Sequence, residues 1–254
     1  MLGKTALITG ASAGFGKAIA IKFAEHGCNI IINGRRTDKL LELENEISNT
    51  CGVKVFPLPF DVSNKEEVNK AVHALPHEWK EIDVLVNNAG LASGLSLIHE
   101  GDTEDWDKMI DTNVKGLLYV SRAVMPMMIE RSKGHIINIS SIAGKEAYLK
   151  GNVYCSTKHA VEAISKSMRI DLLHYGIRVS NISPGAAETE FSLVRFKGDA
   201  ERAHNVYRGY VPLTANDIAE VVYFAASRPA NVVINDLVIT PLAQANVTYI
   251  KKQE

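Results

Sequence analysis

Short apolar runs alternate with helical patterns along almost the whole of this 254-residue sequence. The runs lie at residues 4–9, 28–33, 53–60, 82–87, 135–140, 177–182 and 235–240. Continuously apolar strands that alternate with helices are typical of a parallel sheet covered by helices on both faces. The pattern therefore predicts an α/β fold, a doubly wound parallel sheet of about seven strands. Because no linker or repeat interrupts it, we expect a single domain over residues 1–254.

Several signals set the expected helix ends. The first helix should run from Gly14 to a C-terminal cap at Gly27, and the second from residue 37 to residue 50. Ser63 with Glu66, and Thr214 with Asp217, have the spacing of capping boxes that open helices. Two long helices are expected over residues 103–130 and 152–175.

Charge and cysteine content limit the partners and the cellular compartment that can be expected for the protein. A formal net charge of −1 gives no electrostatic reason to expect nucleic acid or an anionic membrane as a partner. No apolar run reaches the length of a membrane span, and the chain enters a strand pattern directly, so we expect no signal peptide. Three cysteines without metal-ligand spacing indicate reduced thiols in a cytoplasmic protein, and no metal is expected.

The segment TGASAGFG, residues 9–16, connects the first expected strand to the first helix. Its glycines allow a sharp turn and a close approach of the backbone to a phosphate, which a helix N-terminus then stabilises. A P-loop would need Ser or Thr after Lys17, where this chain has Ala18. The loop therefore favours a dinucleotide over a nucleoside triphosphate, in a Rossmann-type sheet.

The second expected strand ends in NGRR. Dinucleotide folds that prefer NAD place an acidic residue there to bind the ribose 2′-hydroxyl. Here Arg35 and Arg36 stand instead, and no carboxylate occurs among residues 33–37. Since guanidinium groups match the geometry of a phosphate, the sequence predicts NADP as the cofactor.

The segment NVYCSTK, residues 152–158, places Tyr154 and Lys158 on the same face of a helix. A free phenol has a pKa of about 10 and is a weak acid-base group at neutral pH. A lysine one turn away favours the phenolate, so the pair is a candidate for proton transfer to or from an alkoxide. The neighbouring Cys155 is interpreted as a packing residue.

Together these motifs resemble the short-chain dehydrogenases/reductases. The resemblance covers essentially the whole chain and is carried by TGASAGFG, NNAG at 87–90, Asn113 in NVKG, SS at 140–141, YCSTK and PG at 184–185. It implies that Ser141 orients the substrate oxygen, Tyr154 transfers the proton, Lys158 also binds the nicotinamide ribose, and Asn113 supports a proton path through water. It further implies a cofactor site formed by Gly10, Ser12, Phe15 (through its backbone), Gly16, Arg35, Arg36, Asp61, Val62, Asn88, Ala89, Gly90, Tyr154, Lys158, Pro184, Gly185 and Thr189.

Within the family, GFG, GRR and FSLVRFKGD (191–199) look most like the branch that oxidises small 3-hydroxy acids such as serine, allo-threonine or 3-hydroxyisobutyrate. A 3-oxoacyl reductase or general carbonyl reductase shares the core motifs, and a catalytically silent NADP-binding regulator is the alternative of another class. Residues 186–213 are expected to form the substrate loop. Arg195, between Val194 and Phe196, either holds the substrate carboxylate or pairs with Asp199 or Glu190.

Two further features bear on the resemblance. The aspartate-glycine-glycine ending that is usual in the family is absent after the last strand, where the chain reads TPLAQANVTYI. The long helices carry apolar residues on more than one face, and the family often forms tetramers through them, so a homotetramer is expected. These apolar residues are Val114, Leu117, Leu118, Val124, Met128, Val161, Ile164, Met168 and Leu172.

Overall fold

Seven strands form one parallel sheet in the computed structural model, which describes residues 1–253. From edge to edge the strands are β3 (Val55–Pro59), β2 (Asn29–Gly34), β1 (Thr5–Ile8), β4 (Ile82–Asn87), β5 (Gly134–Ile139), β6 (Ile177–Pro184) and β7 (Asp236–Ile239). The prolines of the third strand lie in β3, at an edge of the sheet, where a missing amide donor does least harm. The order reverses between β1 and β4, and in such sheets the ligand crevice opens at the carboxyl ends of these strands. The predicted doubly wound α/β fold is confirmed.

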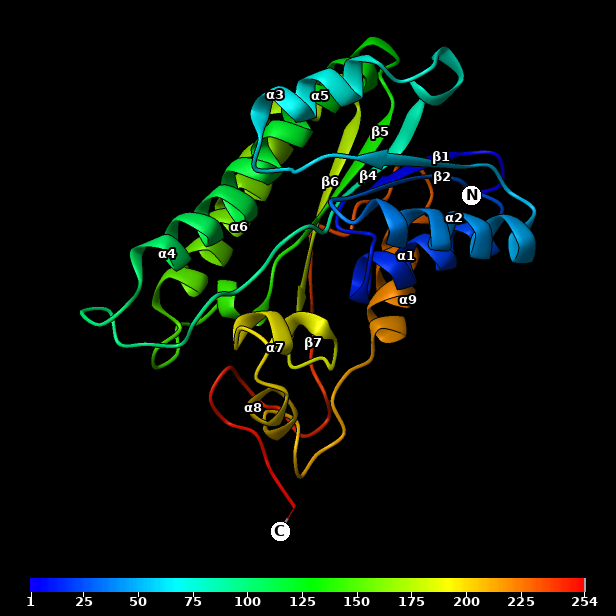
Figure 1. The fold of residues 1–254 in the computed structure, drawn as a ribbon. Coiled ribbons are helices and arrows are strands. Elements are labelled where there is room, and N and C mark those ends of the chain that lie inside the picture. Colours follow the sequence, from blue (N-terminus) through cyan, green and yellow to red (C-terminus); the bar gives the residue numbers. More distant parts are fainter. Residues whose placement is uncertain (254) are drawn as a thin grey trace.

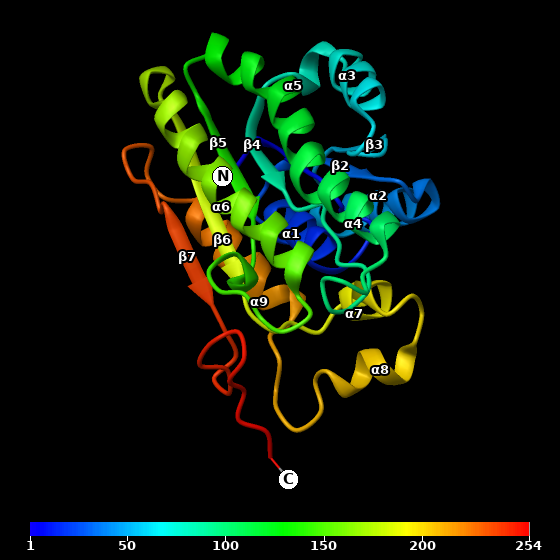
Figure 2. The same ribbon diagram turned by 90° about the vertical axis from the view of Figure 1, so that its left-hand side faces the viewer.

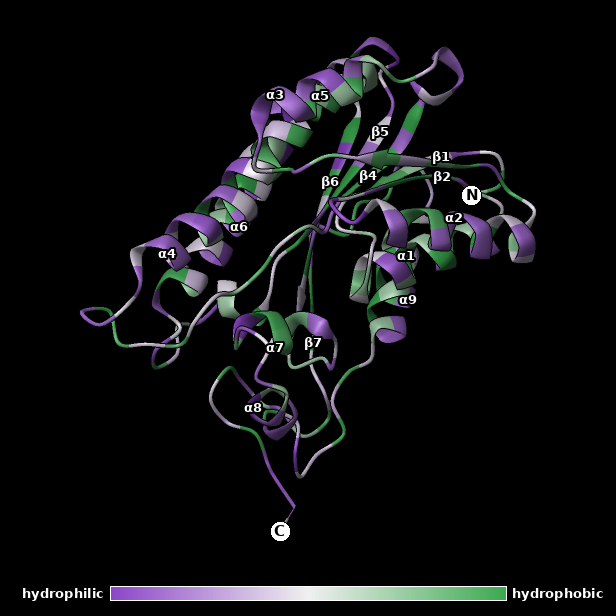
Figure 3. Ribbon diagram, viewed as in Figure 1, coloured by the Kyte–Doolittle hydropathy of each residue, from purple (hydrophilic) through white to green (hydrophobic). Residues whose placement is uncertain are grey.

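Helices cover both faces of the sheet (Figures 1 and 2). One face is covered by α1 (Gly14–Glu25), α2 (Thr37–Cys51) and α9 (Ala215–Ala226), and the other by α3 (Lys65–His73), α5 (Leu117–Glu130) and α6 (Asn152–Asp171). Successive strand residues face opposite layers: Ile30 belongs to the first core, whereas Ile31 belongs to the second. Colouring by hydropathy shows the same division, with apolar strands between helices whose outer faces are polar (Figure 3).

The predicted helix over residues 103–130 is not uniform. It consists of α4 (Thr103–Ile110), a π-helical segment η2 (Asp111–Gly116) and then α5. The predicted helix over 152–175 ends as α6 at Asp171 and is followed by a short 3₁₀ turn, η4 (Leu173–Tyr175). Two further 3₁₀ turns are η1 (His77–Trp79) and η3 (Ile142–Gly144).

One of the two predicted capping boxes is present. At α9, Thr214 accepts from the amide of Asp217, whose carboxylate accepts from the amide of Thr214. The box predicted at Ser63 is wrong, because α3 is capped by Asn64, which accepts from the amides of the two residues at 66 and 67. The Ser63 hydroxyl instead donates to Asp61, at 2.7 Å. At the first helix, Gly27 follows the end of α1 with a φ of +77°, as its capping role requires.

Residues 186–213 contain two short helices that the apolar pattern did not predict, α7 (Glu190–Arg195) and α8 (Ala200–Asn205). Both lie beyond the carboxyl ends of the strands, outside the layers that cover the sheet (Figure 1). The chain after β7 also reaches this end of the molecule, and the amide of Gln253 donates to the carbonyl of Gly209 at 2.7 Å. The substrate segment is therefore contacted by the C-terminal tail.

Most of the apolar residues that suggested an oligomer are covered within the chain itself. Six of the nine are buried, namely Leu117, Val124, Met128, Val161, Met168 and Leu172. Their burial is explained by the second core, so they give no evidence of a partner. Other apolar side chains are exposed on these helices and the turn after them: Ile110, Leu118, Ile170 and Leu173.

Candidate active site

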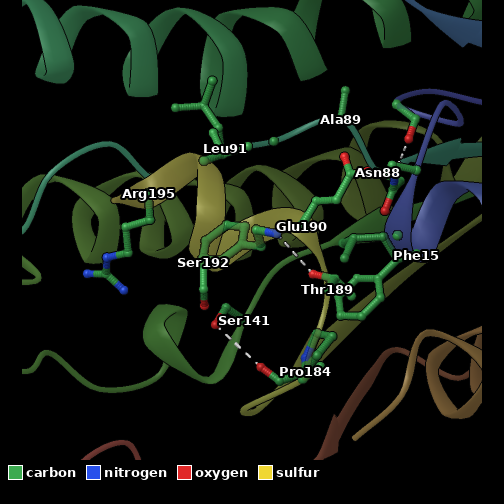
Figure 4. A pocket seen from close by; sticks show the side chains of 18 of the residues that line it. Phe15, Asn88, Ala89, Leu91, Ser141, Pro184, Thr189, Glu190, Ser192 and Arg195 are labelled. Atoms are coloured by element: carbon green, nitrogen blue, oxygen red, sulfur yellow. Dashed lines mark hydrogen bonds between the residues drawn. The ribbon is translucent and has the colours of Figure 1, made fainter. Parts of the chain in front are cut away.

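A cavity of about 480 Å³ lies at the carboxyl ends of the strands. It is bordered by the glycine loop after β1, the segment after β4, the N-terminal turns of α6 and the substrate segment. In Figure 4, Arg195 lies at the end of the cavity away from Phe15 and Asn88. The position agrees with the crevice expected for a doubly wound sheet.

Two glycines of the loop, Gly10 and Gly16, have no space for a side chain. Gly10 has a φ of +66°, and a Cβ there would lie 2.9 Å from the Cα of Ala89. A Cβ on Gly16 would lie 2.2 Å from the carbonyl oxygen of Gly10. The Asn88 side chain ties the two segments together, since its amide donates to the carbonyls of Thr9 and Gly10. Gly10, Ser12 and Phe15 line the cavity at this loop, whereas Gly16 packs behind it and is not part of the lining. A loop of this kind, followed by a helix N-terminus, suits a phosphate.

The two arginines after β2 line the same cavity. Arg36 donates to the hydroxyl of Ser12 at 3.2 Å and to the carboxylate of Glu190 at 3.1 Å. Arg35 lies 3.6 Å from the carboxylate of Asp61, and its side chain is 70% exposed. Both guanidinium groups and the Ser12 hydroxyl therefore line the cavity, next to the carboxylates of Asp61 and Glu190. They are donors that can bind a 2′-phosphate by charge-assisted hydrogen bonds.

Tyr154, Lys158 and Ser141 come together at the centre of the cavity. Tyr154 and Lys158 project from α6 and are 8% and 6% exposed. Lys158 donates to the carbonyl of Ile139 at 2.9 Å and lies 6.0 Å from the centre of the Tyr154 ring. Ser141 accepts from the amide of Ala143 and donates to the carbonyl of Pro184 at 3.3 Å (Figure 4). A hydroxyl, a phenol and an ammonium thus share one largely buried region.

The pKa of Tyr154 is raised in the structure, whereas the sequence predicted that Lys158 would favour the phenolate. Burial raises the pKa of Tyr154 above its ordinary value, the neighbouring Tyr148 raises it further, and the groups that oppose this are Ser141 and Arg195. Burial lowers the pKa of Lys158 from 10.5 to about 8, which the charge of Glu162 opposes. The Lys158 ammonium donates to the Ile139 carbonyl at 2.9 Å and lies 6.0 Å from the centre of the Tyr154 ring, so its positive charge stays beside the phenol.

Asn113 lies in η2 and fixes the backbone beside the lysine. Its side-chain oxygen accepts from the amide of Leu91 at 2.8 Å, and its nitrogen donates to the carbonyl of Leu91 and to Thr157. A Cβ on Gly90 would lie 3.2 Å from the Asn113 oxygen and 3.5 Å from the Lys158 nitrogen. The side chain is therefore fully engaged in shaping the segment next to Lys158, and its part in a proton path stays a prediction.

A model of the short chain dehydrogenase family matches residues 4–199. The chain belongs to this family. It is 48% identical over 240 residues to the NADP-dependent 3-hydroxy acid dehydrogenase YdfG of Salmonella typhi, covering 94% of this chain and 95% of that protein. It is 42% identical over 253 residues to the NADP-dependent 3-hydroxy acid dehydrogenase of Schizosaccharomyces pombe, covering 99% and 98%. Its fold superposes with a TM-score of 0.93 and 44% identity on the closed form of serine dehydrogenase complexed with NADP⁺, covering 98% of this chain and all of that one.

Arg195 is a second cation beside Tyr154 in this short-chain dehydrogenase. Its guanidinium donates to the Tyr148 hydroxyl at 2.8 Å and lies 5.7 Å from the centre of the Tyr154 ring. Neither acid that could have paired with it does so. Glu190 binds Arg36, and the Asp199 side chain accepts from the amide at the start of α8. Arg195 lines the cavity, and among residues 1–253 it forms no ion pair with Asp199 or Glu190. Its binding of a substrate carboxylate stays a prediction.

The remaining predicted cofactor residues border the cavity, each in a structural setting of its own. Val62 is buried against the η2 segment, and a Cβ on Gly116 would lie 2.8 Å from its methyl group. Thr189 caps α7 by accepting from the amide of Phe191. A Cβ on Gly185 would lie 2.3 Å from the side-chain oxygen of Gln244.

Gln244 and Tyr148 are among the residues of the cavity wall that the sequence did not identify. Gln244 is buried in the tail that lacks the family's usual ending, and its oxygen accepts from the amide of Ala186 at 2.8 Å. No motif marks it. Tyr148 contacts Arg195 and lies in the sequence between Ser141 and Tyr154, and this position is the signal that could have found it.

Other sequence-based interpretations have clear outcomes. Cys155 is buried with Ala92 and Met109, which confirms it as a packing residue. Among residues 1–253, no group of three or more His, Cys, Asp or Glu side chains is placed to hold a metal ion. None of the helices formed by these residues is both long and apolar enough to cross a membrane.

Proposed function

We propose that this chain is an NADP(H)-dependent dehydrogenase of small 3-hydroxy acids of the serine, allo-threonine or 3-hydroxyisobutyrate type. The observation that carries the substrate class is Arg195, which lies on the wall of a cavity that also contains Tyr154 and has no carboxylate partner among residues 1–253. A small hydroxy acid must bring its carboxylate out of bulk water, which is costly without a cation to receive it. The near-full-length relatives named for this activity support the same substrate class.

The residues present fit NADP as the cofactor. The backbone cradle at Gly10 and Gly16 has no space for side chains, and Ser12, Arg35 and Arg36 offer the donors that a 2′-phosphate requires. When bound, NADP accepts a hydride from the alcohol carbon or returns it to the carbonyl carbon. The assignments of Phe15, Asp61, Val62, Asn88, Ala89, Gly90, Pro184, Gly185 and Thr189 to the same site are part of this proposal.

The protein's own residues then handle the proton. Tyr154 takes the hydroxyl proton of the substrate during oxidation and donates it to the forming alkoxide during reduction. The raised pKa of Tyr154 favours the protonated phenol, which is the form needed for reduction. Ser141 donates a hydrogen bond to the substrate oxygen, and Lys158 supplies positive charge beside Tyr154 and binds the ribose.

The test is a screen of purified protein for NADP⁺-linked oxidation of L-serine, allo-threonine and 3-hydroxyisobutyrate, beside NADPH-linked reduction of 3-oxoacyl thioesters and neutral ketones. The small hydroxy acids should give the highest kcat/KM. Preferential reduction of acyl thioesters would instead favour a 3-oxoacyl reductase. Absence of any NADP-linked turnover would return the silent regulator to consideration.

We also propose that the chain acts as one domain with residues 186–213 as its substrate segment, and that it assembles as a homotetramer. The exposed apolar side chains Ile110, Leu118, Ile170 and Leu173 support assembly through α4, α5 and the end of α6. Sedimentation at micromolar concentration should give a mass well above 27.8 kDa. A cytoplasmic location is supported by the three unpaired cysteines.

A further inference from the structure

A cluster of charged and polar side chains lies behind the proposed catalytic centre and has no part in the chemistry described so far. Its central member is Glu162, on α6, which is only 6% exposed. One oxygen of its carboxylate accepts from Asn181 at 2.8 Å and from Ser183 at 2.9 Å, and the other accepts from Lys145 at 2.6 Å. A buried carboxylate with this many donors is held in one orientation.

Glu162 is four residues beyond Lys158 on the same helix. Side chains with this spacing are neighbours on one face, with Cβ atoms about 5–6 Å apart. Both side chains are buried, so water screens the attraction between their charges only weakly. Burial works against the protonated form of Lys158, and the charge of Glu162 works for it.

The other groups around the lysine do not supply a negative charge. From β5 it meets the carbonyl of Ile139, and the segments at Gly90 and Asn113 that approach its nitrogen are neutral. On its own helix the titratable residues within one turn, apart from Glu162, are Tyr154, Cys155 and His159, and Arg195 brings a positive charge over the Tyr154 ring. Among residues 1–253, Glu162 is therefore the nearby carboxylate that can balance a charged Lys158.

The groups facing Glu162 determine how much of its charge remains effective. Lys145, after η3, binds both Glu162 and Asp236 of β7, so its ammonium is shared between two carboxylates. Arg169 of α6 adds a positive charge that acts on both acids, and Lys166 adds one that acts on Asp236. The Arg169 guanidinium itself donates to the carbonyls of Val179 and Asn235. Since Lys145 is divided between two acids, part of the negative charge of Glu162 is left to act on Lys158.

The helix is also fixed in place at this point. A Cβ on Gly144, directly before Lys145, would lie 2.7 Å from the carbonyl oxygen of Lys158. This close contact holds the backbone of α6 at Lys158 against η3, while Lys145 holds Glu162 one turn further along. The distance between the two charges is thus set by rigid parts of the fold.

We propose that Glu162 is a positioning residue that keeps the buried ammonium of Lys158 protonated at neutral pH. This inference rests on the proposed function, in which a charged Lys158 assists Tyr154. Without the Glu162 carboxylate, Lys158 would lose its proton at lower pH, and the help it gives to Tyr154 would be lost first under alkaline conditions.

The direct test follows the ionisation of Lys158 in the full-length protein, with and without NADP⁺. NMR of protein labelled at the lysine Cε carbons, with the signal assigned through Lys158→Met, gives the titration midpoint without any turnover. In Glu162→Gln the midpoint should fall by about one pH unit. The kcat for hydroxy acid oxidation should then fall roughly three-fold at pH 7.5 and roughly ten-fold at pH 9.

Two matched variants separate charge from structure. Asp236→Asn removes a carboxylate that binds the same Lys145 but lies on β7, and it should change the midpoint far less than Glu162→Gln. Glu162→Asp keeps the charge and should keep a near-wild-type pH profile even if thermal stability drops. If Glu162→Gln does not fold, the double variant Glu162→Gln/Lys145→Met removes both partners of the ion pair and leaves no unpaired buried charge. The titration midpoint of Lys158 should also fall in this double variant.

An unchanged Lys158 midpoint in folded Glu162→Gln, or an equal change in Asp236→Asn, would overturn the inference. If the wild-type protein oxidised no hydroxy acid while the midpoint still fell, the proposed function would fail and the role of Glu162 toward Lys158 would stand.

Discussion

The two walls of the active-site cavity are built in different ways. Tyr154 and Lys158 lie on a 20-residue helix whose inner face is buried against the sheet, and Ser141 lies two residues after the end of β5. On the opposite wall, Arg195 lies on a six-residue helix and Glu190 begins the same helix with a half-exposed side chain. The first wall is fixed by the packed core, whereas the second is attached through single contacts such as Arg195 to Tyr148 and Glu190 to Arg36.

The first wall therefore carries the residues proposed for proton transfer, and the second wall carries those proposed for substrate recognition. Proton transfer needs groups held in position to within a fraction of an ångström, which long packed elements provide. A segment outside the layers can change its shape and its side chains without disturbing the core. We therefore expect substitutions on the first wall to affect every substrate, and those on the second wall to affect substrates selectively.

The largest expected effect is on the first wall. Tyr154→Phe removes only the phenolic hydroxyl, so kcat should fall by a factor of about 10²–10⁴ for all substrates. NADPH binding, measured by fluorescence titration, should persist, since the ring and its packing remain. The matched control is Tyr175→Phe, because Tyr175 lies on the exposed turn after α6. Retention of substantial activity in Tyr154→Phe would assign proton transfer to another group.

On the second wall, Arg195→Ala should lower kcat/KM for a hydroxy acid by roughly ten- to a hundred-fold, as expected for one charge-assisted hydrogen bond. Activity toward the methyl ester of the same acid should fall much less, because the ester has no carboxylate. Arg202→Ala is the control, since Arg202 packs on Phe196 of the same segment. Equal losses for acid and ester would mean that Arg195 shapes the segment and does not bind the carboxylate.

At the adenosine end, replacing Arg35 and Arg36 together by Ala should reduce the preference for NADP over NAD by roughly ten-fold in kcat/KM. The reason is the loss of both cations that face the 2′-phosphate, while the NAD reaction keeps all its contacts. Arg122→Ala, on the exposed face of α5, should leave the preference unchanged. Equal use of NAD and NADP by the wild-type protein would contradict the cofactor assignment.

The smallest expected effect is on stability, at the start of α9, where the chain leaves the substrate segment and enters a helix that packs on the sheet. Thr214→Val removes the hydroxyl of the capping box at α9 and should lower the free energy of unfolding by about 1 kcal/mol. The kcat should be unchanged, because the cap lies outside the cavity lining. Denaturant unfolding measures the loss, with Thr50→Val at the end of α2 as a control. A large fall in kcat would show that this junction orients the substrate segment.

The sequence predicted the elements of the packed first wall well and those of the substrate segment, the second wall, poorly. The strands and the Tyr154–Lys158 pair were predictable because continuous apolar runs and an i, i+4 spacing determine what is buried and which side chains share a face. The helices α7 and α8 were missed because each is only six residues long, too short to show an apolar period. Ser63 and Asn64 both had suitable side chains for a cap, and the competing contact of Ser63 with Asp61 decided between them.

Charges were harder to predict than positions. The expectation that Lys158 lowers the pKa of Tyr154 followed from their spacing alone. The spacing could not reveal that the ammonium is directed at the Ile139 carbonyl, or that Glu162 is buried with Lys145 and Asn181 behind it. Such partners come from strands and turns distant in the sequence, so only the folded structure brings them together.

The π-helical segment η2 has a consequence for how this protein can be altered. An α-helix turns by about 100° per residue, and a π turn holds one residue more than an α turn. The surplus residue changes the angle around the helix axis at which α5 continues from α4, so it sets which side chains of each helix face inward. Deleting one residue from 111–116 would give a more regular α-helix. It would also rotate α4 relative to α5 and move Asn113 away from its hydrogen-bond partner Leu91. In this protein, a design that idealised the geometry of the helix would remove a feature on which the site depends.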